Sequence, residues 1–297
     1  MAVSFDDYLV VGISSRALFN LEKENEIFET LGLEAYREYQ IEHENDILPK
    51  GSGFNLVNNL LNINQKLNKK YVEVIVMSRN SAETSLRIMN SVEHYGLDIG
   101  RMMMSGGEEI AKYLKAFGVD LFLSCNEEDV SSAINNGIPA GLIYAGSNKY
   151  KSSNQIRIAF DADAVLFSGD SEKIYQQSGL DAFVQNEVDN RDKALERGPL
   201  AKFLFSLSRI QKESKNQQFI RTAIVTARSR DAGVRIIKTL RTWDIVVDEV
   251  FFLQGAKKAD ILQCFGADIF FDDQDVHALP ASEVVPSARV PYKTGDK

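Results

Sequence analysis

The chain has 297 residues, of which 44% are hydrophobic and 26% charged. This apolar content is enough for the cores of one large or two ordinary domains and argues against a disordered chain. Its net charge of −8 disfavours nucleic acid or an anionic membrane as the main partner, since either would favour a basic face. The sequence has only two cysteines, which argues against a disulfide framework. Its three histidines show no HxH or HExxH spacing, which argues against a zinc hydrolase.

The sequence also lacks the usual signals of export and of nucleotide-binding loops. No apolar run approaches the length of a membrane span, and residues 1–7 lack the basic start and apolar core of a secretory signal. We therefore expect a cytoplasmic protein. Neither a GxxxxGK[ST] loop nor a GxGxxG after a strand occurs, which leaves P-loop and dinucleotide-binding functions without support.

The first half of the chain predicts alternating strands and helices. Strands are expected near residues 8–13, 72–77, 100–104, 119–123 and 140–144. Helices are expected near residues 55–68, 81–96, 107–117 and 127–135. Such alternation is typical of a parallel sheet. Residues 145–155, rich in Ser, Asn and Lys, predict a linker, and hence an N-terminal lobe at 1–150 and a second domain at 151–297.

The second half repeats the alternation with one interruption. Strands are expected near residues 156–160, 220–226, 248–253 and 267–271, with helices near 229–242 and 256–265. Between the first two strands, residues 170–214 predict three helical segments, with Gly198-Pro199 opening the last. We interpret this insertion as a helical cap that could close over a substrate. The alternative is a plain crossover enlarged by a helical hairpin.

The two halves carry similar sequences in the same order. Residues 10–19 match 158–167 when one gap is allowed, and residues 117–120 match 265–268. The early copy has serine and arginine where the later copy has acids. We expect two α/β lobes of similar topology, the first without catalytic acids. The alternative is the general likeness of any two βαβ units.

Residues 156–167 carry the strongest functional signal. An apolar run ends in two carboxylates, Asp161 and Asp163, which would emerge at the carboxyl end of a buried parallel strand, where open α/β sheets bind ligands. One carboxylate can attack phosphorus while a second moves the proton. Taken alone, the pair is equally consistent with a surface turn or a helix cap.

Three more strand ends downstream carry polar side chains. Thr226 ends one apolar run, Lys258 follows another, and Asp272 and Asp273 end a third. Phosphoryl transfer needs such groups, because a hydroxyl and an ammonium neutralise phosphoryl oxygens and carboxylates hold Mg²⁺. Each residue also has a structural explanation, as a helix cap or a solvated charge, but all of them in this order favour a phosphoryl-transfer site.

This order of motifs resembles the haloacid dehalogenase-like (HAD-like) phosphatases. The wording FDADAVLFS, IVTARS, LQGAKKADIL and IFFDDQ is closer to the cytosolic 5′-nucleotidase type I family, and SSRALFNLE, YQIEHEN and KTLRTW extend the likeness over most of the chain. The resemblance implies a HAD-like Rossmannoid parallel sheet with a cap. One departure is Ala162, where glycine is expected in the animal members.

The resemblance implies roles for particular residues. Asp161 would be the nucleophile and a Mg²⁺ ligand, and Asp163 the general acid and base, with its carbonyl a second metal ligand. Thr226 and Lys258 would bind the phosphoryl group, with Lys257 the rival of Lys258. The remaining expectations are Asp272 and Asp273 in the metal site and Arg228 in contact with substrate. His43 and His277 are left out of the catalytic set.

The expected reaction is Mg²⁺-dependent hydrolysis of a nucleoside 5′-monophosphate through a phospho-aspartate. The alternatives are a HAD-type phosphatase or phosphotransferase acting on another small phosphate ester, and a nucleotide-binding regulatory protein. The resemblance also implies a nucleotide effector, for which the first half is the expected site. The oligomeric state stays open, a homo-oligomer included.

Overall fold

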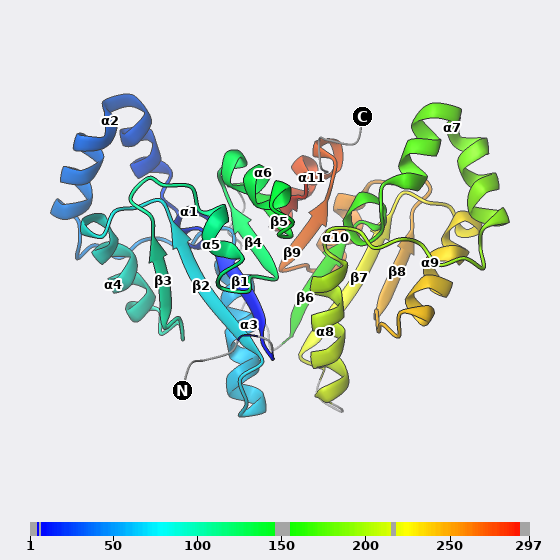
Figure 1. The fold of residues 1–297 in the computed structure, drawn as a ribbon, viewed down its shortest axis with the longest axis horizontal. Coiled ribbons are helices and arrows are strands. Elements are labelled where there is room, and N and C mark those ends of the chain that lie inside the picture. The colour runs from blue at the N-terminus through cyan, green and yellow to red at the C-terminus, as the bar shows by residue number, and fades with distance from the viewer. Residues whose placement is uncertain (1–4, 6, 146–154, 215–217, 292–297) are drawn as a thin grey trace.

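A computed structural model describes residues 5, 7–145, 155–214 and 218–291. Its strands form one ten-stranded sheet in the order β3-β2-β1-β4-β5-β10-β9-β6-β7-β8, covered by helices (Figure 1). The predicted α/β class with a mostly parallel sheet is confirmed. Apart from its two end residues, the predicted linker at 145–155 lies outside the described residues.

The first half of the chain supplies five strands and most of the predicted helices. The strands are β1 (Leu9–Ile13), β2 (Val72–Ser78), β3 (Arg101–Met104), β4 (Leu121–Ser124) and β5 (Ala140–Ile143). The helices are α1 (Ser15–Leu18), α2 (Glu22–Glu42), α3 (Phe54–Leu67), η1 (Glu83–Ser85), α4 (Leu86–His94), α5 (Ala111–Leu114) and α6 (Glu127–Asn135). The helix expected at 107–117 is thus reduced to the single turn of α5.

The second half supplies the other five strands. They are β6 (Ile156–Phe160), β7 (Ile220–Thr226), β8 (Glu249–Phe252), β9 (Ile269–Asp272) and β10 (Ser287–Arg289). The helical segments are η2 (Ala162–Leu166), α7 (Asp170–Asp189), α8 (Ala201–Glu213), α9 (Arg230–Thr242), α10 (Lys258–Phe265) and α11 (Asp275–Ser282). α2, α11 and β10 were not among the predicted elements.

Local sequence explains where the central elements begin and end. β1 and β2 are buried along their whole length, as expected for parallel strands covered on both faces. The Ser229 side chain accepts a hydrogen bond from Ala232 N and caps α9, and α10 ends at Gly266 in the left-handed conformation. These caps place the turns that follow β7 and precede β9.

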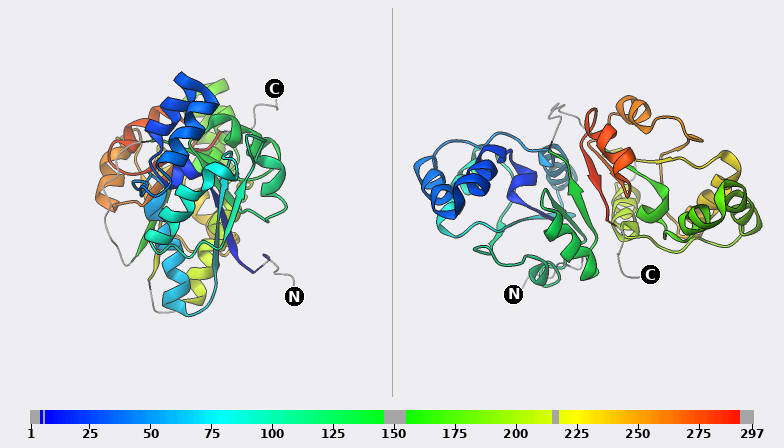
Figure 2. Two further views of the ribbon diagram at one scale, coloured as in Figure 1. Left: turned by 90° about the vertical axis from the view of Figure 1, so that its left-hand side faces the viewer. Right: turned by 90° about the horizontal axis from the view of Figure 1, so that it is seen from above.

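The strand order is the same in both halves of the chain. Within each half all pairings are parallel, in the order β3-β2-β1-β4-β5 and β8-β7-β6-β9-β10. The halves meet where β10 pairs antiparallel with β5, and seen from above they lie side by side (Figure 2).

The two halves also resemble each other in helix breaks and in side-chain contacts. α2 and α7 each break at a glycine with nearly the same backbone angles, Gly32 (φ 86°, ψ −178°) and Gly179 (φ 80°, ψ −178°). Four residues on either side of each glycine, aromatic rings meet edge to face: Phe28 with Tyr36, and Tyr175 with Phe183. The two bent helices stand at the upper left and upper right of Figure 1.

The halves also exchange contacts across the middle of the molecule. Asn59 of α3 donates to Asp268, just before β9 (3.2 Å), while Lys202 of α8 pairs with Asp120, just before β4 (2.6 Å). One apolar core cluster contains residues of both halves, among them Leu61 of α3 and Ile158 of β6. The two halves therefore share a core as well as a sheet.

The segment expected as a cap divides into two different parts. The break at Gly179 splits α7, so residues 170–214 do hold three helical pieces. α8, however, is a core helix, because Phe203, Leu204 and Leu207 are fully buried. The apolar residues of α8 belong to the main core cluster, whereas α7 rises above the sheet at the upper right of Figure 1.

Candidate active site

Asp161 lies at the carboxyl end of β6, between two other parallel strands. Its backbone N–H donates to Phe271 O of β9 (2.7 Å), and the residue is 6% exposed. β6 is flanked by β7 and β9, whose ends carry Thr226 and Asp272. The sheet therefore presents Asp161, Thr226 and Asp272 from three adjacent strands.

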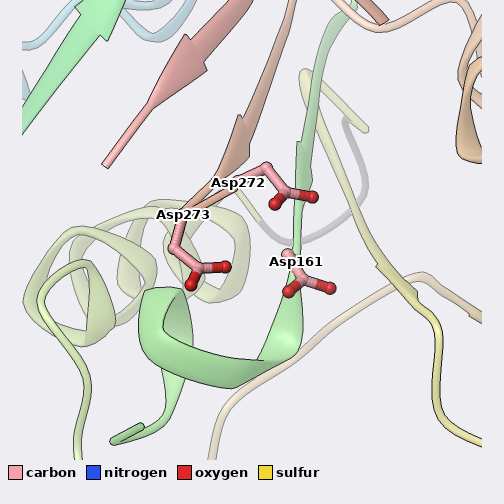
Figure 3. A group of neighbouring side chains, drawn as sticks. All are labelled: Asp161, Asp272 and Asp273. Atoms are coloured by element: carbon pink, nitrogen blue, oxygen red, sulfur yellow. The ribbon is translucent and has the colours of Figure 1, made fainter. Parts of the chain in front are cut away.

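Three carboxylates gather at this point. Asp161, Asp272 and Asp273 each offer an oxygen, and the three oxygens lie within 4.8 Å of one another (Figure 3). The Asp272 side chain is fully buried, and its Oδ1 accepts a hydrogen bond from Gln274 N (3.0 Å). This bond directs the other oxygen of Asp272 toward the neighbouring groups.

Lys258, the first residue of α10, lies between two of these carboxylates. Its Nζ is 2.8 Å from Asp161 Oδ1 and 2.7 Å from Asp272 Oδ2. Burial works against the ammonium, but Asp161 and Asp272 outweigh it and raise the pKa of Lys258. Lys257, the rival in the sequence, is exposed and begins α10 as its N-cap.

The cluster carries more negative than positive charge. Burial raises the pKa of Asp161 and of Asp272, although Lys258 opposes both shifts. Burial, with the charges of Asp161 and Asp272, raises the pKa of Asp273 to about 8. The buried Asp273 Oδ1 accepts no hydrogen bond from any described residue. A small set of converging carboxylate oxygens, one of them without a donor, fits a hard divalent cation such as Mg²⁺.

Thr226 ends β7 with a buried hydroxyl. Its Oγ1 accepts a hydrogen bond from Arg228 N (3.2 Å), two residues on. Because the oxygen is the acceptor in this bond, the hydroxyl keeps its own proton to donate to a ligand.

Asp163 lies apart from the three gathered carboxylates and is held by Arg228. Arg228 Nε and Nη2 donate to the two oxygens of Asp163 at 2.8 and 2.6 Å. Asp163 and Ala164 leave the helical conformation, and Ala164 takes a positive φ of 57°. This local unwinding turns the Asp163 side chain toward β7. Arg228 is 4% exposed and bonded to carboxylates, so the structure does not leave its guanidinium free for a ligand.

Sequence reasoning missed the side chains behind Arg228. Glu187 of α7 is fully buried and binds both Arg228 and Arg235. α7 is rich in acids, and nothing in its sequence separates Glu187 from its solvated neighbours. His277 is half-buried, and burial and the charge of Lys258 lower its pKa.

Ala162 fits the backbone that it occupies. The residue is fully buried and its carbonyl accepts a hydrogen bond from Phe167 N (2.9 Å). The positive φ of this segment falls at Ala164 instead. The departure from glycine at position 162 therefore leaves the turn after Asp161 without backbone strain at that residue.

Comparisons with known proteins identify the family of the chain. A family model described as 5′-nucleotidase matches residues 1–297. Human cytosolic 5′-nucleotidase 1B is 40% identical over 282 residues, which cover 91% of this chain and 46% of that protein, so the chain spans about half the length of this relative. The search of solved structures found no match.

The described helices include none with the length and apolar character needed to cross a bilayer. The chain belongs to the 5′-nucleotidase family.

Proposed function

We propose that the chain is a Mg²⁺-dependent 5′-nucleotidase that releases phosphate from nucleoside 5′-monophosphates. Family membership and the name of its human relative support the reaction class. The observation that carries the chemistry is the buried Asp161 carboxylate, flanked by the Lys258 ammonium and by Asp272 and Asp273.

In the first step an oxygen of Asp161 attacks the phosphorus, and the bond from phosphorus to the 5′ oxygen of the nucleoside breaks. Asp163 gives its proton to the leaving 5′ oxygen, which departs as the nucleoside hydroxyl. In the second step Asp163 takes a proton from water, which attacks the phosphorus and frees phosphate and the Asp161 carboxylate. Thr226 and Lys258 donate to the phosphoryl oxygens in both steps.

The metal would be held by Asp161, Asp272 and Asp273, with the Asp163 carbonyl as a further ligand. When bound, Mg²⁺ supplies positive charge that lets an anionic carboxylate approach an anionic phosphate. The orphaned oxygen of Asp273 and the raised pKa values of the cluster support this assignment.

The matched strand orders support a further proposal about organisation. Residues 1–150 and 151–297 form two related lobes of a HAD-like fold, and only the second lobe is catalytic. α7 would be its cap, since this helix stands away from the core on the side where Glu187 reaches Arg228.

Phosphate release from a panel of esters tests the proposed function. The panel holds purine and pyrimidine ribo- and deoxyribonucleoside 5′-monophosphates, a 3′-monophosphate and a sugar phosphate, each with Mg²⁺ and with a chelator. Asp161→Asn keeps the shape but removes the attacking oxyanion, so we expect a loss on the order of 10⁴-fold or more. Asp260→Asn, exposed on α10, is the control and should stay active. Turnover of the sugar phosphate alone would overturn the substrate assignment.

A further inference from the structure

Glu187, Arg228 and Arg235 form a buried charged group beneath α7. Glu187 Oε2 accepts from Arg228 Nη1 at 2.6 Å, while its Oε1 accepts from Arg235 Nη1 at 3.1 Å and from Ser171 Oγ at 2.8 Å. The side chains of Glu187 and Arg228 are 0% and 2% exposed. Burying such charges is costly unless each is fully paired, so the arrangement calls for a reason beyond stability.

Arg228 is held by Glu187 and by three further contacts outside this group. One edge of the guanidinium holds both oxygens of Asp163, and Nη1 also donates to Ala232 O (3.2 Å). The face of the guanidinium lies over the Phe183 ring, 5.0 Å from its centroid. A planar guanidinium held in this way sets the plane and position of the carboxylate that it binds. Glu187 thereby fixes Arg228, and Arg228 fixes Asp163.

The first half of the chain provides an internal comparison, because it has the same scaffold without the acids. Leu48 N donates to Ser91 Oγ, which donates to Arg87 O, and Leu195 N donates to Thr239 Oγ1, which donates to Arg235 O. Arg87 therefore corresponds to Arg235. Gly32 and Gly179, where α2 and α7 break, give the alignment of the two helices. In this alignment Gln40 corresponds to Glu187, and Glu24 corresponds to Ser171.

A buried carboxylate pairs with the scaffold arginine in both halves but comes from different positions. Arg87 Nη1 binds Glu24 Oε1 (2.6 Å), whereas Arg235 binds Glu187. Asn80 takes the place of Arg228, since its N–H also donates to the hydroxyl at its strand end, Ser78 Oγ (3.2 Å). The half without catalytic acids thus keeps the ion pair between a buried glutamate and the scaffold arginine. It has Asn80 in place of Arg228 and Gln40 in place of Glu187. A carboxylate at 187 is needed only where Arg228 must be held.

We propose that Glu187 is a positioning residue for the reaction, which acts through Arg228 to orient the Asp163 carboxylate toward the leaving group. The inference rests on the proposed function, in which Asp163 protonates the leaving 5′ oxygen. It also ties α7 to proton transfer, because Glu187 links α7 to Arg228, two residues after the end of β7.

Leaving groups of different basicity separate this role from a structural one. A nucleoside 5′ oxygen needs a proton to leave, whereas p-nitrophenolate does not. The comparison uses kcat/KM, which covers only the steps up to the phospho-aspartate and leaves out the second step, where Asp163 acts on the same intermediate for every ester. Glu187→Gln should lower kcat/KM for a nucleoside 5′-monophosphate by about 10- to 100-fold, a fraction of what a lost general acid costs, with kcat/KM for p-nitrophenyl phosphate almost unchanged. Asp163→Asn should show the same selectivity in kcat/KM with a larger loss, while kcat falls for both esters because the second step also needs Asp163. If the parent enzyme does not turn over the aryl ester, acetyl phosphate serves as the second substrate.

A double variant guards against a simple folding defect. Ser171→Glu with Glu187→Gln copies the arrangement of Glu24 and Gln40, which restores a buried carboxylate for Arg235 but not for Arg228. We expect the thermal midpoint to recover toward that of the parent while the selective loss on the nucleotide persists. Asp181→Asn, at an exposed position on the same helix, is the control for charge and should behave as the parent.

Equal losses of kcat/KM on both esters, an unchanged kcat/KM for the nucleotide in Glu187→Gln, or its full recovery in the double variant would each overturn the positioning role. These outcomes require an active parent enzyme. They are therefore distinct from failure of the proposed function, in which the parent itself hydrolyses no nucleoside 5′-monophosphate.

Discussion

The hydroxyls of Ser78 and Thr226 occupy matching positions in the two halves of the molecule. Each ends its strand, β2 or β7, and each accepts a hydrogen bond from the backbone N–H two residues on, at 3.2 Å. The turn after the strand is therefore the same, while the neighbouring acids exist only beside Thr226. The fold supplies the strand-end hydroxyl in both halves, and the carboxylates of β6 and β9 are what distinguish the second half as a candidate for catalysis.

Replacing Lys258 with methionine tests whether its ammonium neutralises the charge of the carboxylate cluster. The change removes the ammonium that lies 2.8 Å from Asp161 and 2.7 Å from Asp272. We expect kcat to fall on the order of 10²- to 10³-fold, as when one preorganised donor to a developing charge is lost. Without metal the thermal midpoint should also fall, because buried carboxylates lose their counter-charge. Phosphate release and thermal unfolding with and without Mg²⁺ measure both effects.

Lys257→Met is the matched control, since this neighbouring lysine is exposed. Its activity should stay within about twofold of the parent, as is usual for a surface change away from the site. Comparable losses in the two lysine variants would contradict the assignment of Lys258 to the phosphoryl site.

Metal binding should release protons at neutral pH. The pKa of Asp273 is raised to about 8 by burial and by Asp161 and Asp272, so its carboxyl is mostly protonated at pH 7 without metal. A metal ligand must be deprotonated, and the apparent affinity for Mg²⁺ should rise by up to about tenfold per pH unit from pH 6 to 8 and then level off. Calorimetry at pH 7 in buffers of different ionisation heat gives the number of protons released.

Asp273→Asn is the variant for comparison in that titration. It should bind Mg²⁺ more weakly and release fewer protons, because the carboxyl that loses a proton is gone. Heats that do not depend on the buffer in the parent enzyme would show that Asp273 is already ionised before the metal binds.

The sequence predicted the strands well and one long helix not at all. Runs such as residues 74–77 and 223–225 are continuously apolar and are followed by a polar residue, which leaves few alternatives to a buried strand. α2 has no comparable signal. Its buried residues are Glu24 and Gln40, and its large apolar residues Phe28, Leu31 and Leu33 are exposed. A helix that buries polar residues lacks the apolar stripe by which a sequence reveals it.

The sequence likewise predicted the residues of the carboxylate cluster but not the buried glutamate that binds Arg228. Asp161, Lys258 and Asp272 follow apolar runs within short motifs, so their convergence follows from parallel strands. The burial of Glu187 depends on Arg228 and Arg235, which lie 41 and 48 residues further along the chain. Only the tertiary fold joins these positions, and a reading of local pattern could not select that glutamate.

The two cysteines should differ in reactivity toward an alkylating agent. Burial raises the pKa of Cys125 to about 12, whereas Cys264 is exposed. Because the thiolate is the reactive form, Cys125 should react on the order of a thousandfold more slowly than an ordinary thiol. Mass spectrometry after brief iodoacetamide treatment of the native protein should find label on Cys264 alone. Equal labelling would show that the end of β4 opens in solution.

Two matching glycines should be intolerant of alanine. A Cβ at Gly198 would lie 2.4 Å from Phe167 O, and one at Gly51 would lie 2.7 Å from Ala17 O. Both glycines also donate to the segment that they approach, through Gly198 N to Leu166 O (2.8 Å) and Gly51 N to Leu18 O (2.9 Å). The clash is with backbone on both sides, so no side chain can move aside to relieve it.

We expect Gly198→Ala and Gly51→Ala each to lower the free energy of unfolding by about 1–3 kcal/mol or more, the usual cost of overpacking. Gly100→Ala is the control, since nothing lies within 4 Å of its Cβ position and its φ is not positive. That change should be neutral or slightly stabilising, because alanine restricts the unfolded chain. Thermal unfolding compares the three variants. If Gly198→Ala has the same thermal midpoint as Gly100→Ala, the backbone at residues 165–167 moves to accept the added methyl group, and the close contact is not the rigid one expected here.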